Sequence, residues 1–196
     1  MPKRALAAPS LLRPERALLE ASWIAALALL ALNDHWLKHA GLLPNWLTGK
    51  LSDFAGLYVA PALLATLVRA RTRGAWLACH AAVLAGFAAI NLDATCAEWC
   101  ARWMRLFGFD WRIVSDAEDL LAVPALIASW RWLTPAMTRP VHDAGARVRR
   151  ALQPGLFAFG MLCCMATSDD GSYEFSAEGP HLHNPSHDTV DRKSVV

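Results

Sequence analysis

The amino-acid sequence predicts an all-α membrane protein, a transmembrane helical bundle of four to five spans with one interfacial amphipathic helix. Three observations lead to this prediction. Apolar residues make up 55% of the 196 residues and charged residues only 18%, and the charges are almost absent from five apolar blocks. Basic residues gather in alternate segments between these blocks. The nine tryptophans fall mainly near the block ends, where the membrane–water interfaces would lie.

The five apolar blocks are the predicted spans. The first follows a basic start and lacks a small-x-small cleavage site, which favours an uncleaved span over a secretory signal peptide. The second and fourth contain Pro61 and Pro124, which a transmembrane helix tolerates. Because several blocks are shorter than the usual span of about 20 residues, soluble core helices are the alternative for any single block, and a four-span bundle without the fifth is the alternative for the whole. The blocks cover Leu18–Leu32, Phe54–Val68, Ala75–Leu92, Leu120–Leu133 and Leu152–Thr167.

Basic residues predict the orientation of the spans. The amino terminus, the segment after the second block and residues 131–150 carry four, three and five basic residues, and they lie on one side if the spans alternate. Lys and Arg favour the cytoplasmic side, so the amino terminus should be cytoplasmic and, with five spans, the carboxyl terminus outside. The outer boundary then receives Trp36, Trp46, Trp99, Trp103 and Trp111. The inner boundary receives Trp76, Trp130 and Trp132.

The chain divides into three expected regions. Residues 1–17 form a cytoplasmic basic amino terminus, residues 18–168 the transmembrane bundle, and residues 169–196 a disordered polar tail without periodic apolar residues. Three histidines in that tail, His181, His183 and His187, have no fold around them and favour weak metal binding at most. The net charge of +2 argues against a nucleic-acid partner and leaves the lipid bilayer as the expected one. The sequence identifies no cofactor, metal or protein partner.

The stretch from Cys96 to Trp111 predicts an amphipathic helix in the outer interface, with its aromatic residues on one face and its charges elsewhere. A packed loop outside the membrane is the alternative. Cys96 and Cys100 lie four residues apart, a spacing at which helix geometry makes a disulfide awkward. We expect them to be two small interfacial side chains, and the sequence leaves their oxidation state open.

Ten polar residues form the candidate site, because the ends of the first four blocks would bring them to the outer face. Helical spacing pairs Asp34 with Lys38 and Lys50 with Asp53. Asp116 and Asp119 would crowd each other, which raises a pKa or recruits a cation. Alternatively, the residues at the starts of the second and fourth blocks, Ser52-Asp53 and Ser115-Asp116, cap helix amino termini. The ten candidates are Asn33, Asp34, His35, Lys38, Lys50, Asp53, Asn91, Asp93, Asp116 and Asp119.

This site leads to a functional hypothesis with two alternatives. The first hypothesis is a non-catalytic protein that binds a cation or a polar lipid head group in an outer-face pocket. The first alternative is a membrane-surface enzyme acting on a lipid-like substrate, with His35 or an acid as general base and Lys50 steadying an anionic head group. The second alternative is a structural or assembly subunit of a membrane complex. The sequence leaves open whether the protein is an enzyme.

Three strings add a resemblance. The strings Asn33-Asp34-His35-x-Leu37-Lys38, Thr48-Gly49-Lys50-Leu51-Ser52-Asp53-Phe54-Ala55-Gly56 and Asp116-x-x-Asp119-Leu120 resemble those of uncharacterised bacterial multi-pass inner-membrane proteins. The resemblance covers about residues 20–135 in short patches, of which the second string is the most specific. It implies a multi-pass protein of a bacterial inner membrane, and it implies no activity.

Overall fold

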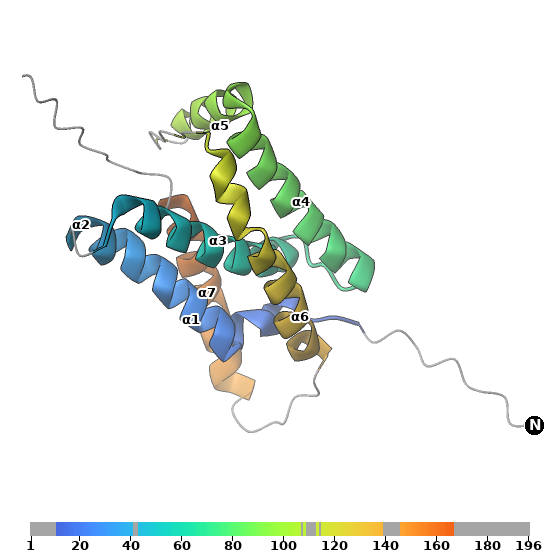
Figure 1. The fold of residues 1–196 in the computed structure, drawn as a ribbon. Helices are drawn as coiled ribbons and strands as arrows, with labels where there is room; N and C mark the ends of the chain where they lie inside the picture. The colour runs from blue at the N-terminus through green and yellow to red at the C-terminus, as the bar shows by residue number, and fades with distance from the viewer. Residues whose placement is uncertain are drawn as a thin grey trace, which may run out of the picture.

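The computed structural model describes residues 11–40, 43–106, 108, 113, 115–138 and 146–166. Throughout these residues the regular structure is helical and no β-strand occurs, so the predicted all-α class is confirmed. Figure 1 shows the helices in chain order. They are the 3-10 helix η1 (Pro14–Leu19), α1 (Ala21–Leu32), the π-helix η2 (Asn33–Leu37), α2 (Lys38–Ala40), α3 (Asn45–Leu67), α4 (Arg73–Leu92), α5 (Ala94–Arg105), the 3-10 helix η3 (Ala117–Ala122), α6 (Pro124–Thr138) and α7 (Ala146–Ala166).

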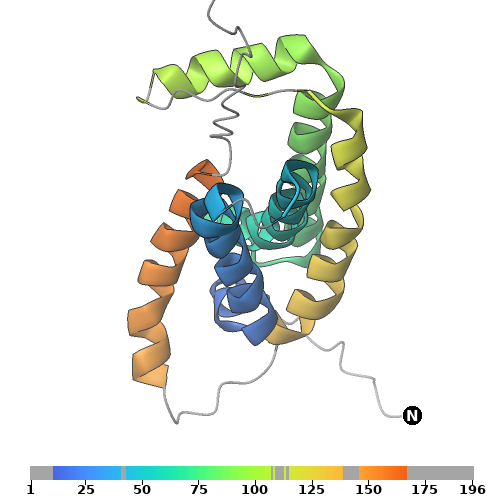
Figure 2. The same ribbon diagram turned by 60° about the vertical axis from the view of Figure 1, so that its left-hand side comes forward.

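Helix α3 lies at the centre of the fold and contacts α1, α4, α6 and α7. Figure 2 shows α7 on one side of α1 and α3, with α4 and α6 on the other. The buried face of α3 is rich in small residues such as Ala55, Ala62 and Ala65, which let neighbouring helices approach closely. The indole N–H of Trp23 on α1 donates to the carbonyl of Val59 at 3.2 Å, which fixes α1 along this face.

The helices place their ends at two opposite poles. At one pole, here called the basic end, the Leu12 N–H donates to the Arg71 carbonyl and the Arg13 N–H to the Met137 carbonyl, so η1 meets the end of α3, the start of α4 and the end of α6. Gln153 near the start of α7 donates to the Glu15 carbonyl at the same pole. The other pole, here called the polar end, joins the end of α1 to the start of α3. The long helices therefore run in alternate directions, as successive spans would.

Two boundaries differ from the sequence-based prediction. Helix α3 begins at Asn45, nine residues before the predicted start at Phe54, because its polar first half finds partners on other helices. Pro124 is the first residue of α6 rather than an interior one, a position where its missing N–H costs no hydrogen bond. In addition, Leu12 and Ala17 pack in the hydrophobic core, although both precede residue 18, where the bundle was expected to start.

Much of the helical surface is apolar. Two segments within the described residues are long and apolar enough to cross a membrane, Arg73–Leu92 and Ala117–Thr138, and α7 contributes a shorter apolar stretch at Ala151–Met165. Most of α4 faces outward, with Leu77, Leu84 and Leu92 exposed. By contrast, α1 has only 12 residues and the first half of α3 is polar, so length and composition alone do not establish four to five spans.

Most tryptophans at the predicted boundaries are exposed, and Trp76 is an exception. It is fully buried, its indole N–H donates to Thr134 Oγ1 at 2.9 Å, and its ring stacks on Trp130 at 6.0 Å between centroids. His80 meets both rings edge-on, between α4 and α6. The ring of Trp76 therefore serves helix packing, and its place at the inner interface stays a prediction. The exposed tryptophans are Trp36, Trp46, Trp99, Trp103 and Trp132.

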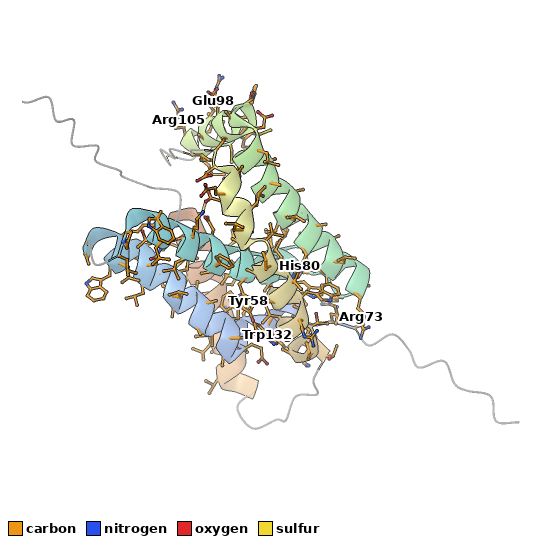
Figure 3. The ribbon with its side chains drawn as sticks, viewed as in Figure 1. Tyr58, Arg73, His80, Glu98, Arg105 and Trp132 are labelled. Carbon is orange, nitrogen blue, oxygen red and sulfur yellow. The ribbon has the colours of Figure 1, made fainter. Side chains whose placement is uncertain are left out.

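The predicted amphipathic helix is α5, which turns sharply away from α4 (Figure 2). It buries Ala97 and Ala101, exposes Trp99 and Trp103, and projects Glu98 and Arg105 away from the bundle (Figure 3), so the packed-loop alternative is wrong. Its place in a membrane interface stays a prediction. Trp111, residues 169–196 and the three tail histidines lie outside the described residues.

Candidate functional site

A π-helical turn at the end of α1 positions the first site residues. Across Asn33–Leu37 the helix widens, and both Asn33 and Asp34 turn inward and are buried. Because a π-turn accommodates one extra residue, it changes the direction of the side chains around it, and such turns occur frequently at functional sites. Here the turn aims the amide of Asn33 at the first half of α3.

Five residues then form the inner cluster, defined as Asn33, Asp34, Lys38, Thr48 and Ser52. Asn33 Nδ2 donates to the Thr48 carbonyl at 2.7 Å and to Ser52 Oγ at 2.6 Å. Ser52 Oγ donates to Asp34 Oδ1 at 2.7 Å, and Lys38 Nζ lies 3.3 Å from the same oxygen. The cluster is almost completely buried, so its hydrogen bonds hold the end of α1 and η2 against α3 in a fixed register.

Four residues form the outer cluster, defined as Lys50, Asp53, Glu118 and Asp119. Lys50 Nζ lies 3.7 Å from both Glu118 Oε2 and Asp119 Oδ1, which joins α3 to η3. The side chains of Asp53 and Asp119 lie close enough for each carboxyl to change the pKa of the other. This cluster reaches the surface, since the Glu118 side chain is 76% exposed and that of Lys50 is 21% exposed.

The pKa of Asp53, which precedes the apolar half of α3, is raised to about 7. Burial is the main cause, because it penalises the charged form, and the neighbouring Asp119 carboxylate adds to it. Lys38 and Lys50 act in the opposite direction. The outer cluster thus contains a carboxyl whose charge changes near neutral pH.

The two clusters occupy adjacent faces of one helix. Thr48 and Ser52 are four residues apart and face α1, whereas Lys50 and Asp53 are three apart and face η3. The hypothesis that Ser52 and Asp53 cap a helix is wrong, because α3 begins at Asn45, well before them. The second capping hypothesis is confirmed for Asp116, which accepts a hydrogen bond from the Glu118 N–H at 2.8 Å at the start of η3.

Six of the ten predicted residues come together in the two clusters. Of the other four, Asp116 acts on Asp119 and raises its pKa, as the predicted crowding of these two acids requires, whereas the remaining three join neither cluster. His35 is exposed, and no hydrogen bond joins it to the clusters among the described residues. Asn91 donates to the Phe87 carbonyl of its own helix at 3.1 Å. Asp93 caps α5 by accepting from the Thr95 N–H at 2.8 Å, and hydrogen bonds with Thr95 lower its pKa. Asp116 serves as the cap described above.

Sequence reasoning missed Thr48, Ser52 and Glu118 as site members. A usable signal was present for the first two. Had the Thr48–Asp53 stretch been assigned to a helix, its four-residue spacing would have put Thr48 and Ser52 on one face, beside the face of Lys50 and Asp53. Nothing in the sequence distinguishes Glu118 from an ordinary solvated acid in the first turn of a helix.

The polar end also carries exposed apolar side chains beside the outer cluster. Phe54 follows Asp53 directly and is 42% exposed, and Leu121, two residues after Asp119, is 64% exposed. Trp46 on the first turn of α3 is exposed as well. The arrangement therefore sets a group of charges of both signs next to apolar surface, which suits an amphiphilic ligand.

The described residues offer little to a metal ion. Among them, no group of three or more His, Cys, Asp or Glu residues is placed to hold one. All five cysteines are free thiols, including Cys96 and Cys100. Cys96 Sγ instead donates to Asp93 Oδ2 at 3.5 Å, and this hydrogen bond raises the pKa of its thiol.

Comparisons of the chain with protein-family models, with curated proteins and with solved structures found no match. The resemblance of the three strings to bacterial inner-membrane proteins, and the location that it implies, therefore stay predictions.

Proposed function

We propose that this chain is a multi-pass membrane protein of four to five spans, in a bacterial inner membrane with a cytoplasmic amino terminus, whose polar end lies at the outer face and binds a polar lipid head group. The observation that carries the proposal is the outer cluster, where Lys50 and three carboxyls from α3 and η3 open to the surface beside exposed apolar side chains.

The surface of the helices supports the membrane part of the proposal. Soluble monomers rarely expose contiguous apolar patches larger than a few hundred Å², yet only four of the 20 residues of α4 are buried, and Leu77, Leu84 and Leu92 on it are exposed. The arginines Arg69, Arg71 and Arg73 gather at the basic end, where positive charge favours the cytoplasmic side. The alternating directions of α1, α3, α4, α6 and α7 fit five spans, and the same helices without α7 fit four.

The composition of the outer cluster favours a head group over a bare metal ion. A divalent cation prefers several oxygen ligands without a competing ammonium group, whereas here Lys50 lies 3.7 Å from two of the carboxylates. A lipid head group presents both hydrogen-bonding groups and charge, and its acyl chains would follow Phe54 and Leu121 away from the site.

The geometry does not support the enzyme hypothesis through His35, which is exposed and joins neither cluster. It does favour a structural role for the inner cluster. Ser52 sits between Asn33 and Asp34 in a buried chain of hydrogen bonds, and that chain fixes two helices rather than presenting groups to a ligand. We therefore assign helix packing to the inner cluster and ligand binding to the outer one.

The binding part of the proposal is tested by ligand-dependent thermal stabilisation of the full chain in detergent. Added bacterial polar lipid should raise the Tm of the wild type by several degrees, whereas Lys50→Gln and Asp119→Asn should lose most of that increase. Glu98→Gln, an exposed acid on α5, is the matched control and should keep it. Magnesium chloride alone should give no stabilisation that depends on Asp119. Full lipid stabilisation in both outer-cluster variants would refute the binding site.

The structural part is tested by removing one hydroxyl. Ser52→Ala removes one buried hydrogen bond from Asn33 and one from Asp34, which keep their contacts with the Thr48 carbonyl and with Lys38. We therefore expect a loss of about 1–3 kcal/mol in the free energy of unfolding, with the lipid-dependent shift retained. Ser129→Ala is the matched control, because that hydroxyl is fully buried and has no hydrogen bond among the described residues. Equal stability of the two variants would contradict the packing role.

A further inference from the structure

In the outer cluster, the ammonium group of Lys50 lies too far from the neighbouring carboxyls for a close hydrogen bond. Lys50 Nζ stands 3.7 Å from Glu118 Oε2 and from Asp119 Oδ1, beyond the range of about 2.7–3.2 Å in which an N–H donates to oxygen. The attraction to these carboxylates is therefore an ion pair without a close hydrogen bond. The three N–H donors of the ammonium group remain suited to the oxygens of an incoming phosphate.

The carboxyl pair offers the complementary half. Asp53 on α3 and Asp119 on η3 lie close enough for each carboxyl to change the pKa of the other, and Asp119 Oδ1 lies 3.7 Å from Lys50 Nζ, so the site presents neighbouring carboxylate oxygens. A primary ammonium group carries three N–H donors and one positive charge, so it can donate to both carboxylates. A quaternary ammonium has no N–H and cannot do so.

The net charge of the site decides between ligand classes. The charged groups of the two clusters are the carboxyls of Asp34, Asp53, Glu118 and Asp119 and the ammonium groups of Lys38 and Lys50, which gives a formal charge of −2 when all are ionised. An anionic head group would bring further negative charge to this surplus. A head group with one phosphate and one ammonium adds no net charge and matches both signs.

An independent observation on the inner side also calls for a donor. The side chain of Asn33 in the inner cluster is fully buried, and its Oδ1 has no hydrogen-bond partner among the described residues. The opposite amide orientation would not help, because the Thr48 carbonyl requires a donor at the position of Nδ2. The inner cluster next to the outer one thus keeps an acceptor that a water molecule would satisfy.

We infer that the ligand of the outer cluster is a zwitterionic phospholipid with a primary amine, whose phosphate is held by Lys50, whose ammonium is held by Asp53 and Asp119, and whose acyl chains lie along Phe54 and Leu121. This inference rests on the proposed function and names the class of lipid that the same site takes.

The test compares lipids that differ in one group each. The full chain in detergent is titrated with short-chain phosphatidylethanolamine, phosphatidylcholine and phosphatidylglycerol, and with glycerophosphoethanolamine, which has the head group without acyl chains. Phosphatidylethanolamine should bind at least tenfold more tightly than each of the other three. Asp53→Asn and Asp119→Asn should remove the preference for the primary amine, Lys50→Gln should weaken both zwitterionic lipids, and Glu98→Gln should change nothing.

The outcomes separate the two proposals. Two results would overturn the amine assignment: equal binding of phosphatidylethanolamine and phosphatidylcholine, or tighter binding of phosphatidylglycerol. If Lys50→Gln still loses lipid binding in that case, the binding site itself stands. Equal binding of glycerophosphoethanolamine and the whole lipid would overturn the role of the acyl chains. If no variant changes the binding of any lipid, the proposed function itself fails.

Discussion

Asp53 shows how neighbours set the chemistry of a single residue. Its carboxyl is partly buried on α3, lies near the Asp119 carboxyl, and is attracted to the ammonium groups of Lys38 and Lys50. Burial and the second carboxyl outweigh the two lysines, so the pKa rises to about 7 rather than falling. The residue is therefore the group of the outer cluster whose charge changes near neutral pH.

This shift predicts a pH dependence of stability with a definite sign. Because the pKa is higher in the folded state than the value of 3.8 for the free side chain, the folded state binds the proton more tightly and ionisation destabilises it. The cost is absent below about pH 4, grows between pH 4 and 7, and is constant above. Asp53→Asn, which resembles the protonated form, should match the wild type at pH 4.

By pH 8 the same variant should be more stable than the wild type by about 1–2 kcal/mol, once solvent screening of a partly exposed group is allowed for. Thermal unfolding across this range measures the difference, with Glu98→Gln as the control. A difference between Asp53→Asn and the wild type that stays constant from pH 4 to pH 8 would show that the carboxyl is not shifted.

Close approach of helices decides how α7 packs. A Cβ atom at Gly160 would lie 3.0 Å from Leu63 Cδ2 and 3.2 Å from the Trp23 ring, so glycine lets α7 lie directly against α3 and α1. Gly155 on the same helix has nothing within 4 Å of the equivalent position. The fifth apolar block is thus an integrated part of the bundle, which the sequence alone did not establish.

A pair of substitutions tests this packing. Gly160→Leu should force α7 away from Trp23 and Leu63 and lower the free energy of unfolding by about 1–3 kcal/mol, the usual cost of overpacking. Gly155→Leu should be neutral or slightly stabilising, because leucine favours a helix more than glycine does. Thermal unfolding of both variants decides the matter, and an equal effect of the two would show that α7 does not pack as described.

At the scale of the whole molecule, the sequence predicted which segments are helical better than it predicted where they begin. The apolar blocks stand out because long apolar stretches need burial in protein or lipid whatever their partners. The start of α3 was missed because Thr48–Asp53 reads as a polar connection unless one knows that Asn33 and Asp119 meet it across the fold. The helix-packing role of Trp76 was missed for the same reason, since its partners Trp130 and Thr134 lie more than 50 residues away in the sequence.

The candidate site was predictable only in part. Pairs set by helical spacing, such as Asp34 with Lys38, follow from the sequence. The division into a buried inner cluster and an open outer cluster does not, because it depends on the π-turn at Asn33 and on the angle at which η3 meets α3. Asn91 and Asp93 end their helix near the same pole, yet each finds a local partner, and sequence spacing cannot exclude such partners.

The central claim is that the bundle spans a membrane with its outer cluster facing outward, and side-specific cysteine labelling tests it most directly. With the five native cysteines replaced by alanine, single cysteines are placed at Glu118, the exposed member of the outer cluster, and at Arg71, at the basic end. A membrane-impermeant maleimide added to intact bacterial cells with a permeable outer membrane should label Glu118→Cys and should label Arg71→Cys only after the inner membrane is opened. Equal labelling of both positions in intact cells, labelling of Arg71→Cys alone, or recovery of the protein free of the membrane fraction would contradict the account.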